Sequence, residues 1–193
     1  MRPILWFAIQ KAKRYRKKNN LPDRYEITEE EVEKARKRGA EQDYDCTTVK
    51  PKLLKGLTLE KVELPHCGAW FVSSPDNPKD KVLYYIHGGG FVYGSTRGAF
   101  PFVSYAVKKF GYNVFSVDYR LAPDHKCMDT VADCEDGFKW LLERYEAKNI
   151  ITMGESAGGN LVLALPQKLR DDCLPMPGGI IASSPVVQFR YYP

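Results

Sequence analysis

The chain has 193 residues and a hydrophobic content of 44%, enough for a single domain with a sizeable core. Its net charge of +5 comes from one end, because residues 1–20 hold seven of the 29 basic residues and no acidic one, which leaves 22 basic against 24 acidic residues elsewhere. The near-neutral body argues against an acidic partner such as nucleic acid, and five cysteines without a Cys-x-x-Cys pair argue against a disulfide framework or a zinc site.

The basic N-terminal arm, residues 1–20, has an amphipathic pattern. Leu5, Trp6 and Ile9 stand among the basic residues and favour a helix with one apolar face. The apolar run 4–9 is too short for a membrane span or for the core of a typical signal peptide. We therefore expect no stable membrane insertion and a soluble, cytoplasmic protein with reduced cysteines.

A short helix is predicted over residues 29–38. Thr28 and Glu31 fit a capping box, in which the threonine hydroxyl accepts from the Glu31 amide and the glutamate reaches back. Three basic residues at 36–38 favour the negative end of a helix, and Gly39 suits a left-handed helix terminus. We expect this helix and the arm to form a separate N-terminal region, residues 1–50.

From about Gly56 the pattern changes to short strands that alternate with helices. Thr58–Glu63 alternates like a half-buried strand and has Gly68–Ser73 as its expected hairpin partner, whereas the continuous apolar run Val82–Ile86 is typical of a central strand. Apolar residues at helical spacing between 131 and 145 predict a helix. Further strands are expected at Asn113–Tyr119, Ile150–Met153 and Ile180–Ala182. Right-handed crossovers then give a six-stranded α/β fold over residues 51–193, with a mostly parallel sheet between helices.

The stretch Gly154-Glu155-Ser156-Ala157-Gly158 carries the strongest chemical signal. It follows an apolar strand and opens a predicted helix, the setting in which Gly-x-Ser-x-Gly places a serine at a strained turn called the nucleophile elbow. There the Ser156 hydroxyl stands clear of the sheet, and the Ala157 amide points toward the oxygen of a bound acyl group. The alternative is a chance match at an ordinary helix N-terminus capped by serine. The position between strand and helix, downstream of a glycine-rich loop, favours a nucleophile.

That glycine-rich loop is His87-Gly88-Gly89-Gly90, which follows the predicted strand Val82–Ile86. Glycines let a loop turn its amides toward a developing oxyanion, where such donors contribute on the order of 3 kcal/mol. A phosphate-binding loop is the rival interpretation, but neither Gly-x-x-x-x-Gly-Lys nor Gly-x-Gly-x-x-Gly is present. The apolar continuation at 91–93 argues against a merely flexible turn. We expect His87 to order the loop by hydrogen bonding rather than to act as a general base.

Three motifs occur in order along the chain: His87-Gly88-Gly89-Gly90-Phe91, Asp118-Tyr119-Arg120-Leu121-Ala122-Pro123 and Gly154-Glu155-Ser156-Ala157-Gly158-Gly159-Asn160. Together they resemble the hormone-sensitive-lipase-like family of α/β-hydrolases, esterases that often cleave short-acyl carboxylic esters. The resemblance runs from about Thr58 to Pro185. It implies a nucleophile at Ser156 and a cap made by the N-terminal helices. It also implies an oxyanion hole made of backbone amides, which map onto Gly88, Gly89 or Gly90 and onto Ala157. The segment with Asp118 and Arg120 is implied to be structural.

The family pattern also places a catalytic acid and then a histidine after the serine, beyond later strands of an eight-stranded fold. This chain has three histidines, at positions 66, 87 and 125, all before Ser156, and it ends 37 residues after that serine. Asp171 and Asp172 fall at the end of the helix that Ser156 opens, where we expect them to be solvated. The triad acid and base are therefore expected to be absent, together with the last strands, and the chain to be inactive alone.

Three functional hypotheses follow from the sequence. The first is a serine hydrolase that cleaves small carboxylic esters without a cofactor or metal, with amide substrates as an alternative for the same serine. The second is a non-catalytic binding domain that retains the hydrolase fold. The third assigns the basic arm to nucleic acid or an anionic membrane surface. For the arm we expect instead a place over the cleft, because its apolar face suits a hydrophobic pocket better than phosphates.

Overall fold

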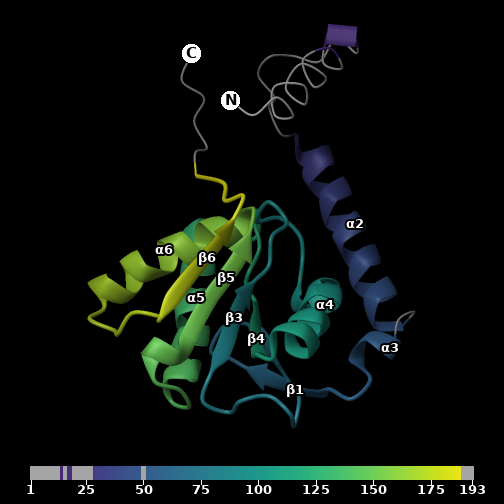
Figure 1. Ribbon diagram of the computed structural model, residues 1–193. Coiled ribbons are helices and arrows are strands. Elements are labelled where there is room, and N and C mark those ends of the chain that lie inside the picture. The colour runs from purple at the N-terminus through teal and green to yellow at the C-terminus, as the bar shows by residue number, and fades with distance from the viewer. Residues whose placement is uncertain (1–13, 15–16, 19–27, 49–50, 188–193) are drawn as a thin grey trace. The chain divides into compact units, whose positions relative to one another are not determined.

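A six-stranded sheet organises the part of the chain that the computed structural model describes, residues 14, 17–18, 28–48 and 51–187 (Figure 1). The sheet lies in the second of the two units into which the chain divides, Met1–Val32 and Glu33–Pro193. In the order β1-β2-β4-β3-β5-β6, the pairs β1–β2 and β2–β4 are antiparallel and the other three are parallel. The strands are β1 (Thr58–Glu63), β2 (Gly68–Ser73), β3 (Val82–Ile86), β4 (Asn113–Asp118), β5 (Ile150–Glu155) and β6 (Gly179–Ser183). They confirm the six predicted strands and the α/β fold class.

Strand β3 is the centre of the sheet and determines where the candidate site lies. It pairs with β4 on one side and β5 on the other, and all five of its residues are buried, as its continuous apolar run predicts. In the register with β5, Ile86 lies opposite Gly154. Because the two strands are parallel, the loop that follows β3 and the turn that follows β5 emerge side by side at the same edge of the sheet.

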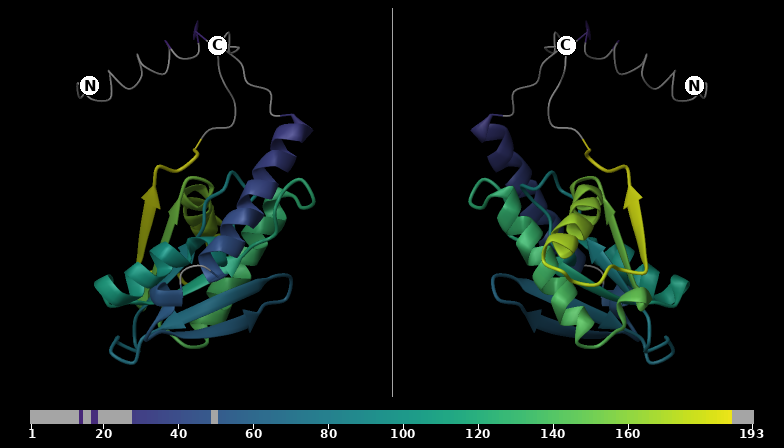
Figure 2. Two further views of the ribbon diagram at one scale, coloured as in Figure 1. Left: turned by 90° about the vertical axis from the view of Figure 1, so that its right-hand side faces the viewer. Right: turned by 90° about the vertical axis from the view of Figure 1, so that its left-hand side faces the viewer.

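Helices cover both faces of the sheet. Figures 1 and 2 show α4 (Thr96–Tyr105) on one face, with α5 (Cys127–Leu142) and α6 (Ala157–Asp171) on the other. Successive residues of β3 enter different cores, because Tyr84 packs in the cluster that contains Phe138 of α5, and Tyr85 in the cluster that contains Phe100 of α4. Helix α5 confirms the helix predicted from residues 131–145. Shorter elements are α3 (Pro51–Leu54), η1 (Ala106–Phe110) and η2 (Ala147–Asn149).

Helix α2 (Glu29–Thr48) begins where the sequence predicts but ends ten residues later. The capping box is confirmed, since the Thr28 amide donates to Glu31 Oε2 at 3.0 Å and the Glu31 amide to Thr28 Oγ1 at 3.3 Å. The expected helix end at Gly39 is wrong. Gly39 is buried within the helix, and a Cβ added to it would lie 2.8 Å from the Cβ of Tyr93. The glycine therefore allows close packing of α2 on the loop after β3 rather than a left-handed turn.

The last strand, β6, forms one edge of the sheet. It pairs only with β5 among the described strands, and the side chains of Ile180 and Ile181 are 43% and 47% exposed. Such an edge presents unpaired backbone groups that favour association with other strands.

The basic arm, residues 1–20, lies almost wholly outside the described residues, so its predicted helix and its place over the cleft stay predictions. Among the described residues, no helix is long and apolar enough to cross a membrane. The expected cytoplasmic location and the boundary between residues 50 and 51 likewise stay predictions.

Candidate active site

Ser156 occupies a sharp turn between β5, which ends at Glu155, and α6, which begins at Ala157. Its backbone has φ +53° and ψ −114°, a conformation that non-glycine residues rarely adopt and that costs of the order of 1–3 kcal/mol. The Ser156 side chain makes no capping hydrogen bond to the first turn of α6. These observations argue against an ordinary capping serine, and they confirm the predicted turn between strand and helix.

The glycines that flank Ser156 allow α6 to pack directly on the ends of the central strands. A Cβ on Gly158 would lie 2.0 Å from the carbonyl oxygen of Ile86, and one on Gly154 would lie 2.4 Å from backbone atoms of Gly158. Real Cβ atoms do not approach backbone atoms so closely, so any side chain at either position would push the helix away. The two glycines thus hold the strained turn at its place above the sheet.

The glycine-rich loop lies beside Ser156, since a Cβ on Gly88 would be 3.4 Å from the Cβ of Ser156. Gly89 has φ +118°, and the amides of residues 92 and 93 both donate to its carbonyl oxygen at 3.1 Å, which closes the loop. Within the described residues, the amides of Gly89 and Gly90 have no hydrogen-bond acceptor. Ala157 is the first residue of α6, so its amide has no acceptor within the helix. These three amides are available to an added oxygen.

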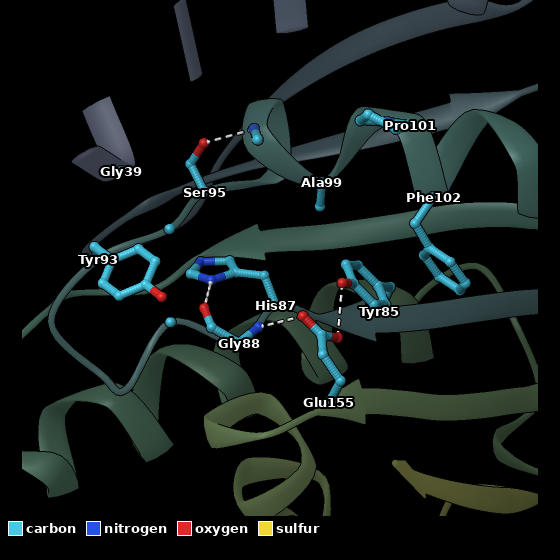
Figure 3. A pocket seen from close by; sticks show the side chains of 13 residues that line it. Gly39, Tyr85, His87, Gly88, Tyr93, Ser95, Ala99, Pro101, Phe102 and Glu155 are labelled. Carbon is cyan, nitrogen blue, oxygen red and sulfur yellow. Dashed lines mark hydrogen bonds between the residues drawn. The ribbon is translucent and has the colours of Figure 1, made fainter. Parts of the chain in front are cut away.

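The amide of Gly88 has a different partner, the carboxylate of Glu155. Figure 3 shows this carboxylate between Gly88, whose amide donates to Oε1 at 2.7 Å, and Tyr85, whose hydroxyl donates to Oε2 at 2.7 Å. Burial raises the pKa of Tyr85, and the negative charge of Glu155 raises it further, so the phenol remains a neutral donor. Glu155 therefore fastens the glycine loop to the end of β5.

The sequence analysis missed the roles of Glu155 and Tyr85. Glu155 is the variable residue of Gly-x-Ser-x-Gly, and Tyr85 is one apolar residue within a buried run. The signal that could have found them is strand register: Tyr85 pairs with Met153, and Glu155 follows two residues later on the same face of β5. A carboxylate at the end of that face, beside a tyrosine, indicates a hydrogen bond.

His87 orders the glycine loop, as the sequence predicts. Its Nδ1 donates to the Gly88 carbonyl oxygen at 2.7 Å, and its ring stacks on Tyr119 with the centroids 4.2 Å apart. The Tyr119 hydroxyl donates to the His87 carbonyl oxygen at 2.9 Å, and the Ala122 amide donates to that of Phe91 at 2.8 Å. These bonds join the glycine-rich motif to the Asp118–Pro123 motif.

Asp118 and Arg120 have structural contacts, as the resemblance implies. Asp118 Oδ1 accepts from the Thr96 amide at the start of α4. Arg120 donates to the fully buried Asp133 of α5 through its backbone amide at 2.8 Å, Nη2 at 2.7 Å and Nε at 3.0 Å. The two side chains thus connect the end of β4 to helices on opposite faces of the sheet.

A cavity of about 360 Å³ adjoins the glycine loop on the side of α4. It is lined by loop residues, the Glu155 carboxylate, α4 side chains and Gly39 of α2, among them Gly88, Tyr93, Ala99 and Phe102 (Figure 3). One wall is apolar, and the opposite wall consists of backbone and polar groups. Ser156 is not among the residues that line this cavity, although it adjoins Gly88, which does.

The remaining histidines and the late aspartates are not beside Ser156. His66 lies in the β1–β2 hairpin with its Nδ1 3.3 Å from Asp136, and His125 is exposed in the loop before α5. Asp171 and Asp172 lie at the end of α6, are 63% and 39% exposed, and pair with neighbouring basic residues, which confirms that they are solvated. The structure brings the serine and the glycine loop together. All three histidines are among the described residues, and none of them places an exposed imidazole at this site.

Comparison with known proteins identifies this arrangement. A family model described as alpha/beta hydrolase fold matches residues 83–192, more than half of the chain. The structure superposes on EstE7, a homologue of hormone-sensitive lipase from a metagenome library, with a TM-score of 0.70 and 30% identity, over 81% of this chain and 53% of that one. The chain belongs to the hormone-sensitive-lipase-like family of α/β-hydrolases.

Other members of the family are named as esterases. The chain is 34% identical over 157 residues to the carboxylesterase/phospholipase LipF of Mycobacterium tuberculosis, a match that covers 78% of this chain and 41% of LipF. It also superposes on EstE5, crystallised and soaked with p-nitrophenyl butyrate, with a TM-score of 0.71 and 28% identity over 92% of this chain and 57% of EstE5. The chain therefore spans about half the length of the relatives it matches.

Proposed function

We propose that Ser156 is the nucleophile of a hydrolase that cleaves carboxylic esters. The observation that carries this proposal is the strained turn at Ser156, with φ +53° and no capping hydrogen bond, directly beside the glycine loop. The serine oxygen attacks the ester carbonyl carbon, its proton passes to a base, and the alcohol leaves with a proton. Water then hydrolyses the acyl-serine, releasing the acid and restoring the hydroxyl. The reaction uses no cofactor or metal.

The oxyanion hole in this proposal consists of the amides of Gly89, Gly90 and Ala157. They are the amides near the serine that have no acceptor among the described residues, whereas the Gly88 amide already donates to Glu155. Gly88 then acts as the anchor of the loop rather than as a donor to the substrate. Fixed amides of this kind stabilise the charge that develops on the substrate oxygen, by roughly 3 kcal/mol for one donor.

The proposed substrates are small esters with short acyl groups. The names of LipF, a carboxylesterase/phospholipase, and of EstE5, soaked with a butyrate ester, support this class. A cavity of about 360 Å³ with one apolar wall beside the glycine loop is consistent with it. The cap over this cavity is proposed to include α2, because Gly39 contributes to its lining.

The proposed reaction also needs a base, and none of the three histidines, all of them among the described residues, offers an exposed imidazole beside the serine. His66 contacts Asp136, His125 is exposed, and the ring of His87 is buried against Tyr119. We therefore propose that the 193-residue chain, by itself, does not turn over esters at an enzymatic rate. A serine hydroxyl without a base is a weak nucleophile, although an oxyanion hole alone leaves slow catalysis above water.

The test is the release of p-nitrophenolate from p-nitrophenyl butyrate by the purified chain and by Ser156→Ala. We expect the parent chain to release it slowly, at most about once per molecule, and Ser156→Ala to fall to the background rate. Equal release by both proteins would contradict a nucleophilic Ser156 and favour a non-catalytic binding domain. Many turnovers that disappear in Ser156→Ala would show that a base lies within the chain, and His125 would then be the first to examine.

A further inference from the structure

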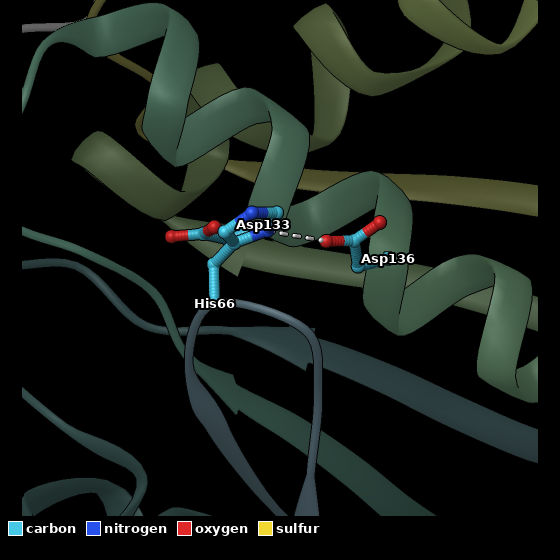
Figure 4. A group of neighbouring side chains, drawn as sticks. All are labelled: His66, Asp133 and Asp136. Atoms are coloured by element: carbon cyan, nitrogen blue, oxygen red, sulfur yellow. Dashed lines mark hydrogen bonds and ion pairs between the residues drawn. The ribbon is translucent and has the colours of Figure 1, made fainter.

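A second group of chemically active side chains lies apart from the Ser156 site, where the β1–β2 hairpin meets α5. It consists of His66, Asp133 and Asp136, whose potential ligand atoms all lie within 4.8 Å of one another. Figure 4 shows the His66 imidazole directed from the hairpin toward α5, where the two carboxylates are on successive turns. Positions three apart on a helix share a face, so both aspartates are presented to the same histidine.

One carboxylate of the cluster has an oxygen without a partner, and the other is shared with Arg120. Asp136 is 18% exposed, and its one hydrogen-bond partner among the described residues is His66, at 3.3 Å from Oδ2, so Oδ1 has none. Asp133 is fully buried, and Arg120 donates to both of its oxygens, with Nε shared between them, so a cation would share this carboxylate with the guanidinium. The His66 side chain is 57% exposed and is free to adjust.

The charge of the cluster favours a cation. Two carboxylates, those of Asp133 and Asp136, lie beside the His66 imidazole. Arg120 pairs with Asp133, whereas His66 is the one ion-pair partner that the described residues offer to Asp136.

We propose that His66, Asp133 and Asp136 bind a divalent transition-metal cation of the Zn²⁺ or Co²⁺ type, which joins the β1–β2 hairpin to α5. One imidazole with two carboxylates suits these cations, which bind three protein ligands and complete their shell with water. At metal–ligand distances of about 2.0–2.2 Å, donor atoms are roughly 3.5 Å apart. His66 and Asp136 already meet this spacing at 3.3 Å, and because all the ligand atoms lie within 4.8 Å of one another, Asp133 needs a shift of at most about 1.3 Å. The sequence argument against zinc concerned cysteine ligands, and this site uses none.

The experiment is thermal unfolding of the 193-residue chain at increasing Zn²⁺, with the visible spectrum of bound Co²⁺ as a second readout. At about 100-fold excess over Kd, we expect Tm to rise by roughly 5–10 °C. The rise should be lost in His66→Ala and Asp136→Asn, because each removes a ligand. The Co²⁺ spectrum should lack thiolate charge-transfer bands.

The controls are His125→Ala, which removes an exposed histidine outside the cluster, and Cys67→Ser, which removes the neighbouring thiol. Both variants should keep the full rise in Tm. Because the quantity compared is the metal-dependent rise, a variant with a lower starting Tm is still informative. No rise in the parent chain at millimolar Zn²⁺, or a rise that His66→Ala retains, would overturn the proposal.

Discussion

Replacing Gly158 with alanine should strongly destabilise the protein. The added Cβ would lie 2.0 Å from the carbonyl oxygen of Ile86 and 2.6 Å from that of His87, and both are backbone atoms at the end of β3. Overpacking a core costs typically 1–3 kcal/mol, and a clash with fixed backbone belongs at the upper end or above it. We expect a loss of about 3 kcal/mol or more in the free energy of unfolding, which lowers Tm by roughly 6–12 °C.

The matched control is Gly68→Ala in β2, where an added Cβ meets no atom within 4 Å. Its effect should lie within about 0.5 kcal/mol of zero, because alanine there adds no clash and restricts the unfolded chain. Urea unfolding followed by circular dichroism measures both variants. If Gly158→Ala were as stable as Gly68→Ala, the close packing of α6 on β3, and with it the position assigned to the Ser156 turn, would be refuted.

Two further predictions concern buried charge and thiol reactivity. Arg120→Ala removes the guanidinium from the buried carboxylate of Asp133 and should lower the free energy of unfolding by about 3–5 kcal/mol, measured with urea. Arg170→Ala breaks only an exposed ion pair and should lower it by under about 1 kcal/mol, and similar losses in the two variants would contradict this contrast. At pH 8 iodoacetamide should alkylate the exposed Cys127 well before Cys67. Burial raises the pKa of the Cys67 thiol from 9.0 to about 12, which lowers its thiolate fraction roughly a thousandfold. Equal alkylation rates of the two cysteines, measured by mass spectrometry, would refute this.

Features that depend on neighbouring residues could be predicted from the sequence. The alternation in Thr58–Glu63 and the apolar run in Val82–Ile86 follow from which faces of each strand are buried, and both strands are found as predicted. The Thr28–Glu31 capping box is a local exchange of hydrogen bonds and forms as expected. The turn at Ser156 was predictable because the Gly-x-Ser-x-Gly motif stands between an apolar run and a predicted helix, although the packing that Gly158 allows involves the distant end of β3.

Features that depend on distant residues could not be predicted in the same way. Gly39 has the local signature of a helix end, but a contact with Tyr93, 54 positions later, determines its role. The bond from Gly88 to Glu155 spans 67 positions and the contact of His66 with Asp136 spans 70. Each requires the strand register or the placement of α5, which residue patterns within a single segment do not contain.

The most direct test of a nucleophilic Ser156 is to locate the acyl group after reaction with p-nitrophenyl butyrate, with imidazole added as a base. Tandem mass spectrometry of the 193-residue chain should find the butyryl group on Ser156, because this serine stands at a strained turn next to the glycine loop. The butyryl adduct should be absent from Ser156→Ala, and no other serine of that variant should carry it instead. Acylation spread over surface serines and lysines, equal in both proteins, would contradict the account.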